Sequence, residues 1–100
     1  MTMHYLLMYD LCADYAERRA TWRNEHLKLA WAAAERGDLV LGGALEDPID
    51  TAVLLFKGET PAAAEAFVQA DPYVREGLVT GWRVRPWKTV VGEHASNPVR

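Results

Sequence analysis

The segment MHYLLMYDL, residues 3–11, constrains the fold most, because it is rich in apolar residues on both of its faces. Successive side chains of a β-strand point to opposite sides of the sheet. The two faces carry His4, Leu6 and Met8 on one side and Tyr5, Leu7 and Tyr9 on the other. A strand of this kind needs cover on both sides. In a chain of 100 residues helices can cover one side, so the second apolar face indicates a second copy of the chain.

The rest of the chain alternates between helix-like and strand-like segments. A helix is expected from Asp14, which with Glu17 resembles a capping box, to about Arg36, where Gly37 would end it. The further expected elements are strands over 39–45, 51–56 and 78–91, a helix that begins at Thr60-Pro61 and ends near Ala70, and one helical turn over 72–76. The turn over 46–50 predicts a hairpin, and Pro86 predicts an edge or a bulge in the last strand.

The order β-α-β-β-α-β predicts an α+β protein of the ferredoxin-like class. This class has a four-stranded antiparallel sheet with two helices on one face. We expect a single domain over residues 1–100, with a core over 3–91 and a loose polar tail over 92–100.

Composition limits the partners. The formal net charge is −3, and the eleven lysines and arginines are scattered among fourteen acidic residues, so no basic stripe for nucleic acid is present. No apolar run has membrane length, and the N-terminal segment lacks a basic region and a long apolar run. One cysteine allows no internal disulfide. We expect a cytoplasmic protein that binds neither nucleic acid nor membranes.

The first helix carries its most informative residues on its apolar side. At about 100° per residue, the expected apolar stripe consists of Ala16, Ala20, Leu27, Ala30, Trp31 and Ala34. Arg23 falls inside this stripe, and His26 lies on its flank beside Arg23. Beyond His26 the apolar arc is extended by Trp22, Leu29 and Ala33. Such a pair would face an anionic or carbonyl-bearing ligand. Alternatively, Arg23 extends to solvent and His26 is a hydrogen-bonded residue at the edge of the core.

Other chemistry-bearing patterns are missing from the sequence. His4, His26 and His94 lack metal-ligand spacing, and neither a glycine-rich phosphate loop nor a GxSxG motif occurs. We therefore expect no metal and no cofactor. Four tryptophans are candidates for lining an aromatic pocket or for the core: Trp22, Trp31, Trp82 and Trp87.

Four segments together resemble the YciI-like (YCII-related) domains, a family of dimeric α+β barrel proteins. The segments are WRNEHLKL, RGDLVLGGAL, ADPYVREGL and WRVRPWKTV, and their order and spacing agree over roughly residues 3–91. The chain departs from the pattern at Gly43, where many relatives have a Gly-Pro strand end. The resemblance implies a homodimer with a pocket between the first helix and the sheet in each copy.

The resemblance also implies a His-Asp pair, which in this sequence is His26 and Asp71, with Arg23 and Tyr73 at the same pocket. Asp71-Pro72 is at the same time a helix start, so we expect one carboxylate oxygen to cap the turn and the other to hold His26. Some relatives eliminate chloride from small ring compounds or isomerise them. A dehydrochlorinase-like or muconolactone-isomerase-like activity on a small organic ring or acid is thus implied.

The pair makes chemical sense for such reactions. Imidazole can give or take a proton near neutral pH, and a carboxylate at one ring nitrogen fixes its tautomer. His26 would be the general base or acid, Asp71 its orienting partner, and Arg23 the stabiliser of a developing negative charge. Two alternatives stay open: a non-catalytic ligand-binding or accessory domain with the same pocket, and a purely structural hydrogen bond.

Overall fold

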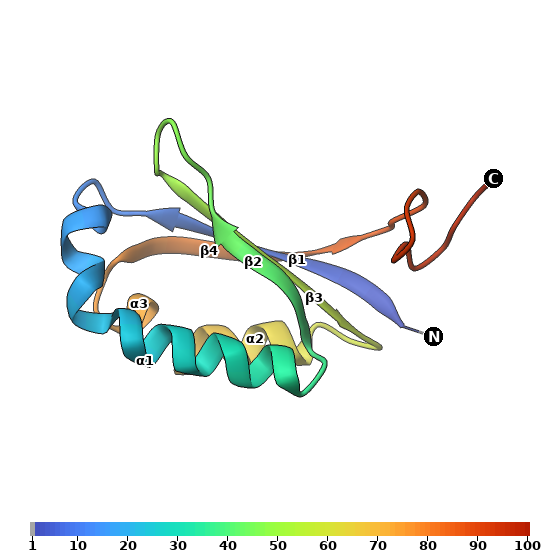
Figure 1. The fold of residues 1–100 in the computed structure, drawn as a ribbon, viewed down its shortest axis with the longest axis horizontal. Helices are drawn as coiled ribbons and strands as arrows, with labels where there is room; N and C mark the ends of the chain where they lie inside the picture. The colour runs from blue at the N-terminus through green and yellow to red at the C-terminus, as the bar shows by residue number, and fades with distance from the viewer. Residues whose placement is uncertain (1) are drawn as a thin grey trace.

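The computed structural model describes residues 2–100 and has one antiparallel four-stranded sheet with all helices on one face (Figure 1). The elements are β1 (Met3–Leu11), α1 (Tyr15–Glu35), β2 (Leu39–Ala44), β3 (Thr51–Gly58), α2 (Ala62–Ala70), α3 (Pro72–Arg75) and β4 (Val79–Trp87). The strand order across the sheet is β2-β3-β1-β4. The predicted ferredoxin-like βαββαβ fold is confirmed.

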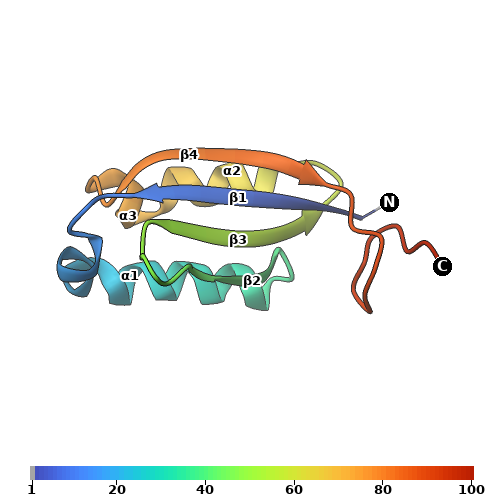
Figure 2. The same cartoon turned by 90° about the horizontal axis from the view of Figure 1, so that it is seen from above.

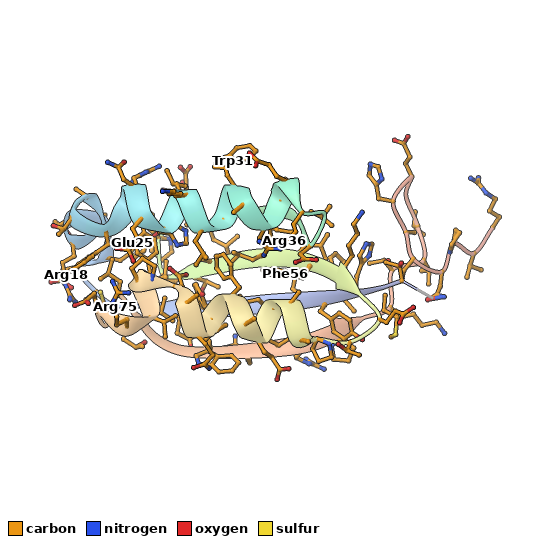
Figure 3. The ribbon with its side chains drawn as sticks, turned by 90° about the horizontal axis from the view of Figure 1, so that it is seen from below. Arg18, Glu25, Trp31, Arg36, Phe56 and Arg75 are labelled. Atoms are coloured by element: carbon orange, nitrogen blue, oxygen red, sulfur yellow. The ribbon has the colours of Figure 1, made fainter. Side chains whose placement is uncertain are left out.

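The main core lies between the sheet and the helices. β1 is central, and its Leu7 lies opposite Leu54 of β3 and Val84 of β4. Phe56 of β3 packs against Phe67 of α2, with ring centroids 5.6 Å apart, and points between sheet and helices (Figure 3). The inward face of β1 is buried, as its alternation predicts: Tyr5, Leu7 and Tyr9.

The opposite face of the sheet carries no helix, as the view from above shows (Figure 2). Four apolar side chains of the central strands are only half-buried on this face: Leu6, Met8, Val53 and Leu55. Leu41 of β2, which pairs with Leu55, is 72% exposed. The second face of β1 is therefore buried only at His4 and stays partly open at Leu6 and Met8 in a single copy of the chain.

The start of α1 differs from the expected capping box. Asp14 is the N-cap residue, but its side chain makes no capping hydrogen bond. Its Oδ1 accepts a hydrogen bond from Cys12 Sγ at 3.2 Å and lies 3.8 Å from Arg18 Nη1. The nearby thiol and guanidinium thus hold the carboxylate that would have capped the helix. The predicted end is confirmed, because Gly37 follows the helix with a positive φ of +88°.

The predicted apolar side of α1 is only partly right. Trp22, Leu29 and Ala33, which extend the predicted arc, pack in or against the core, as do Ala30 and Ala34, but Leu27 and Trp31 do not. Trp31 is 65% exposed and Leu27 is 38% exposed, and Trp31 lies on the side of α1 away from α2 (Figure 3). The face toward the sheet and α3 carries Tyr15, Arg19, Trp22, His26, Leu29 and Ala33. These residues follow one another at steps of three or four, which is one helix face. Two polar residues, Arg19 and His26, interrupt this face, so its apolar periodicity is hard to recognise in the sequence.

The C-terminal part also departs from expectation. β4 ends at Trp87, before the predicted end at Val91, and its Pro86 lies in an edge strand as predicted. In the tail, Asn97 N donates to Thr89 O and Val99 N donates to Val90 O, each at 2.9 Å, and its looseness stays a prediction. Within residues 2–100, no helix is long and apolar enough to cross a membrane. A cytoplasmic location stays a prediction.

Candidate functional site

A pocket of about 420 Å³ opens between α1 and the strands β2 and β3. Its floor exists because the inward residues there are small: Gly42, Ala44 and Ala52. A Cβ added at Gly42 would lie 3.3 Å from Leu54 Cγ, so a larger residue there would require the Leu54 side chain to move. A volume in this range suits one small organic ligand.

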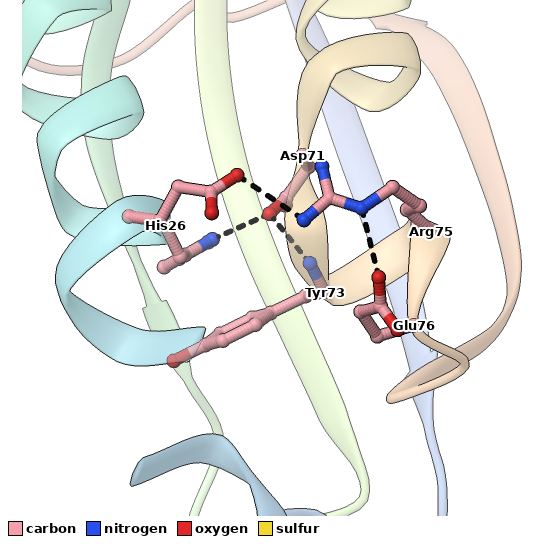
Figure 4. Close-up of polar contacts among 6 residues, drawn as sticks. His26, Asp71, Tyr73, Arg75 and Glu76 are labelled. Carbon is pink, nitrogen blue, oxygen red and sulfur yellow. Dashed lines mark hydrogen bonds and ion pairs between the residues drawn. The ribbon is translucent and has the colours of Figure 1, made fainter. Parts of the chain in front are cut away.

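His26 reaches this pocket from the middle of α1 and is held in one orientation. Its Nδ1 lies 2.8 Å from Asp71 Oδ1, and 15% of its side chain is exposed (Figure 4). Its ring stacks on Tyr73 at 3.9 Å with an interplanar angle of 8°. Phe67 meets the ring edge-on at 6.1 Å. No group in the described chain hydrogen-bonds to His26 Nε2, so this nitrogen is free for a ligand.

Asp71 is the buried centre of the site, with a relative exposure of 1%. Its Oδ1 accepts from both His26 Nδ1 and Tyr73 N, at 2.8 and 3.0 Å. Its Oδ2 accepts from the Tyr9 hydroxyl at 2.8 Å. The expectation that one oxygen caps the turn and the other holds the histidine is therefore wrong: Oδ1 does both. The reason is that Tyr9, on β1, occupies Oδ2.

Tyr9 was not singled out by its sequence context, because it looks like any inward aromatic residue of a buried strand. Burial, followed by the negative charge of Asp71 and the hydrogen bond to it, raises the pKa of the Tyr9 hydroxyl far above its usual range. Tyr9 therefore stays a neutral donor to the carboxylate. With the other two donors it compensates the desolvation of Asp71.

One end of the pocket is polar. Tyr15, Arg19, Arg23 and Tyr73 all line it. Burial and the neighbouring Tyr15 raise the pKa of the Tyr73 hydroxyl to about 12, against the lowering effect of Arg23 and Arg19. The Arg19 guanidinium carbon lies 5.6 Å from the centre of the Tyr15 ring.

Ion pairs outside the pocket tie its two helical segments together. Arg75 of α3 pairs with Glu25 of α1 at 3.2 Å and with Glu76 at 2.9 Å (Figure 4). The Arg75 guanidinium also lies over the Trp22 ring at 5.5 Å. These contacts hold α3, which begins after Asp71, beside the helix that carries His26. Because they are exposed and screened by solvent, each of these pairs adds little stability by itself.

The structure brings together all four residues named from the sequence. His26, Arg23 and Tyr73 line the pocket, and Asp71 lies directly behind His26. Of the four tryptophans, Trp31 alone is among the residues that line the pocket in the described chain. Arg19 and Tyr15 were missed. Nowhere in residues 2–100 do three or more His, Cys, Asp or Glu side chains gather in a way that could hold a metal ion.

Residues 3–88 match the YCII-related domain family. No curated protein matches the chain. A similar solved structure is 5-chloro-2-hydroxyhydroquinone dehydrochlorinase (TftG) from Burkholderia phenoliruptrix AC1100 in complex with 2,5-dihydroxybenzoquinone, at 20% identity and a TM-score of 0.72, covering 94% of this chain and 100% of that one. A NIPSNAP family protein from Agrobacterium tumefaciens is 11% identical with a TM-score of 0.61, covering 96% and 98%. These two likenesses show the shared fold.

Proposed function

This chain belongs to the YCII-related domain family, and from that premise we propose that it is a small cofactor-independent enzyme of the lyase or isomerase type. Its reaction is the movement of a proton on a small ring compound by His26, oriented by Asp71. The observation that carries this proposal is the hydrogen bond from His26 Nδ1 to the buried Asp71, which leaves Nε2 free at a pocket.

The hydrogen bond determines which ring nitrogen can act. Because Asp71 is an acceptor, Nδ1 carries the proton and Nε2 presents its lone pair in the neutral ring. Nε2 then takes a proton from a substrate carbon next to a carbonyl, and the imidazolium that forms is stabilised by Asp71. Arg23 stabilises the negative charge that develops on the carbonyl oxygen.

Two outcomes follow from the same first step. In a lyase reaction the electron pair of the broken C–H bond forms a new double bond, and a leaving group such as chloride departs with the C–Cl bonding pair. In an isomerase reaction His26 returns the proton to a different carbon. Similarity in fold to a dehydrochlorinase supports the first outcome. The substrate pocket accommodates one small ring in either case.

The test uses the full-length chain and a panel of small cyclic ketones, enones and hydroxyquinones in deuterated water. The proposal predicts deuterium incorporation next to the carbonyl of at least one compound, and loss of this exchange in His26→Gln. With 5-chloro-2-hydroxyhydroquinone, release of chloride is measured, since loss of HCl leaves a hydroxyquinone. Exchange that is unchanged in the folded variant would contradict the proposal. Binding without any exchange would favour a ligand-binding or accessory domain.

We also propose that the chain forms a homodimer through the open face of its sheet. Half-buried Leu6, Met8 and Leu55 lie at the centre of this face, and exposed large apolar surfaces of this kind mark interaction sites. Two sheets packed face to face would form the barrel typical of the family. Sedimentation at micromolar concentration should give a dimer, and Met8→Glu should give a folded monomer. A monomeric wild-type chain would contradict the proposal.

A further inference from the structure

Two arginines line the pocket without a carboxylate partner. Four other arginines each pair with an acidic side chain: Arg18, Arg36, Arg75 and Arg83. Arg19 and Arg23 have no such pair anywhere in residues 2–100. No aspartate or glutamate lines this pocket in the part of the chain that the structure describes. The lining of the pocket therefore presents two cationic side chains and no carboxylate, which favours an anionic ligand.

The two guanidiniums lie on the same side of α1 as His26. Arg19 and Arg23 are one helical turn apart, and His26 follows Arg23 by three residues, so the three side chains line one helix face. Both arginines act on the Tyr73 hydroxyl, and the Tyr73 ring stacks on His26. Tyr73 thus connects the positive end of the pocket to the proton-transfer residue.

The rest of the pocket lining is apolar, and the residues of its floor are small. Gly42, Ala44 and Ala52 form its floor, and exposed Leu27 and Trp31 of α1 border it. Apolar walls over small floor residues suit a flat ring better than a branched aliphatic chain. The ring would lie along β2, with its charged substituent toward α1.

We propose that the pocket selects a flat ring compound with one anionic oxygen substituent, a carboxylate or phenolate, and that Arg19 is a second substrate-positioning residue beside Arg23. The binding of such a ligand does not depend on the proposed function; only its role as a substrate rests on that proposal. Arg19 is half-buried against the Tyr15 ring, so its guanidinium is already ordered before a ligand arrives. An ordered guanidinium binds a carboxylate at a smaller entropic cost.

The test is calorimetric titration of the wild-type chain with three matched probes: benzoate, its neutral isostere benzamide, and acetate, which lacks the ring. Benzoate should bind at least about tenfold more tightly than either of the other two, since a hydrogen bond to a charged group contributes about 1.5–3 kcal/mol. Equal affinity for benzoate and benzamide, or for benzoate and acetate, would overturn the inference.

Two variants then test whether the positive charge of Arg19 is the one that binds the anionic group. Arg19→Gln should weaken benzoate binding about tenfold and leave benzamide unchanged. Lys28→Gln, which removes an exposed cation from the same helix outside the pocket, is the matched control and should leave both affinities unchanged. Circular dichroism and thermal unfolding check that each variant is folded. Equal losses in both variants would mean that only the overall charge matters, and would overturn the assignment of Arg19.

The same titrations separate this inference from the proposed reaction. His26→Gln should retain benzoate binding while deuterium exchange is lost. If no compound exchanges but benzoate binding depends on Arg19, the ligand class stands without the reaction. If exchange occurs and Arg19→Gln binds and exchanges like the wild type, the reaction stands and this inference fails.

Discussion

Two histidines of this chain are held through Nδ1, and the comparison between them shows how the proposed proton-transfer site differs from a structural one. His26 Nδ1 lies 2.8 Å from the Asp71 carboxylate, whereas His4 Nδ1 lies 2.7 Å from the Thr89 hydroxyl. Both border a hollow, of about 420 Å³ for His26 and about 380 Å³ for His4. Burial and space are therefore not what distinguishes the two sites.

The partners of the two rings differ in charge and rigidity. A carboxylate fixes the tautomer of His26 and stabilises its protonated form, whereas a hydroxyl can donate or accept and fixes neither. Tyr73 stacks on His26, but the described residues include no aromatic ring contact to His4. His4 instead joins the C-terminal segment to the sheet through Thr89, which also accepts from Ser96 N. This difference is the reason why we propose a chemical role for His26 and an anchoring role for His4.

The largest effect is expected on turnover. His26→Gln should lower the rate of deuterium exchange by about 10²–10⁴-fold, the usual contribution of a general base. His4→Gln should leave the rate within about twofold of the wild-type rate, because His4 does not line the pocket that contains His26. Exchange rates of both folded variants, measured on the same compound, check this. A similar loss in both would erase the distinction between the two sites.

The next effect concerns stability. Asp71→Ala removes the acceptor of His26, Tyr73 N and Tyr9, so the free energy of unfolding should fall by about 3 kcal/mol. Thr89→Ala, at the equivalent position of the His4 site, should cost about 1 kcal/mol. Urea denaturation gives both values. Equal losses of unfolding free energy would mean that the Asp71 carboxylate stabilises the fold no more than the Thr89 hydroxyl does.

A pH dependence follows from Tyr73, which only the His26 site contains. Its pKa is raised from 10.0 in the unfolded chain to about 12, so the folded state holds this proton more tightly. The resulting stabilisation is fully present below pH 10 and is lost as pH rises toward 12. The unfolding free energy of the wild type should therefore fall more steeply above pH 10 than that of Tyr73→Phe. Parallel curves would show that Tyr73 does not titrate in this way.

The smallest effect should come from the pocket floor. In Gly42→Ala the new Cβ would lie 3.3 Å from Leu54 Cγ, so the side chain must move by a few tenths of an ångström. We expect a loss of about 1 kcal/mol in stability and weaker binding of benzoate. Gly43→Ala is the control for stability, since its Cβ would meet no atom within 4 Å. Urea denaturation should separate the two variants, and titration with benzoate compares Gly42→Ala with the wild type. Unchanged stability and unchanged affinity in Gly42→Ala would mean that the floor limits neither packing nor the ligand.

Much of the fold could be predicted from local patterns. The alternation of β1, the glycine after α1 and the Asp71-Pro72 helix start are short-range signals, and each is where the sequence predicts it. The ends of β4 and the tail were less predictable, because the contacts that order them are between residues distant in the sequence, such as His4 and Thr89. Local propensity carries no information on such contacts.

The site itself was only partly predictable. His26 and Asp71 are 45 residues apart in sequence, so no spacing rule joins them, and only the family resemblance paired them. Tyr9 gave no signal, since an inward tyrosine of β1 is also an ordinary core residue. Arg19 was missed because it lies on the helix face that packs against the core. A charged residue there makes this face look less apolar in the sequence than the neighbouring face.

The most direct test of the central claim is nuclear magnetic resonance of the histidine ring nitrogens in the wild-type chain at neutral pH. In the neutral ring, the hydrogen bond to Asp71 predicts that Nδ1 of His26 carries the proton and that Nε2 has a free lone pair. Addition of benzoate should shift the Nε2 resonance of His26 and leave both nitrogens of His4 unchanged. A proton on Nε2 of neutral His26, or a ligand response at His4 alone, would contradict the account.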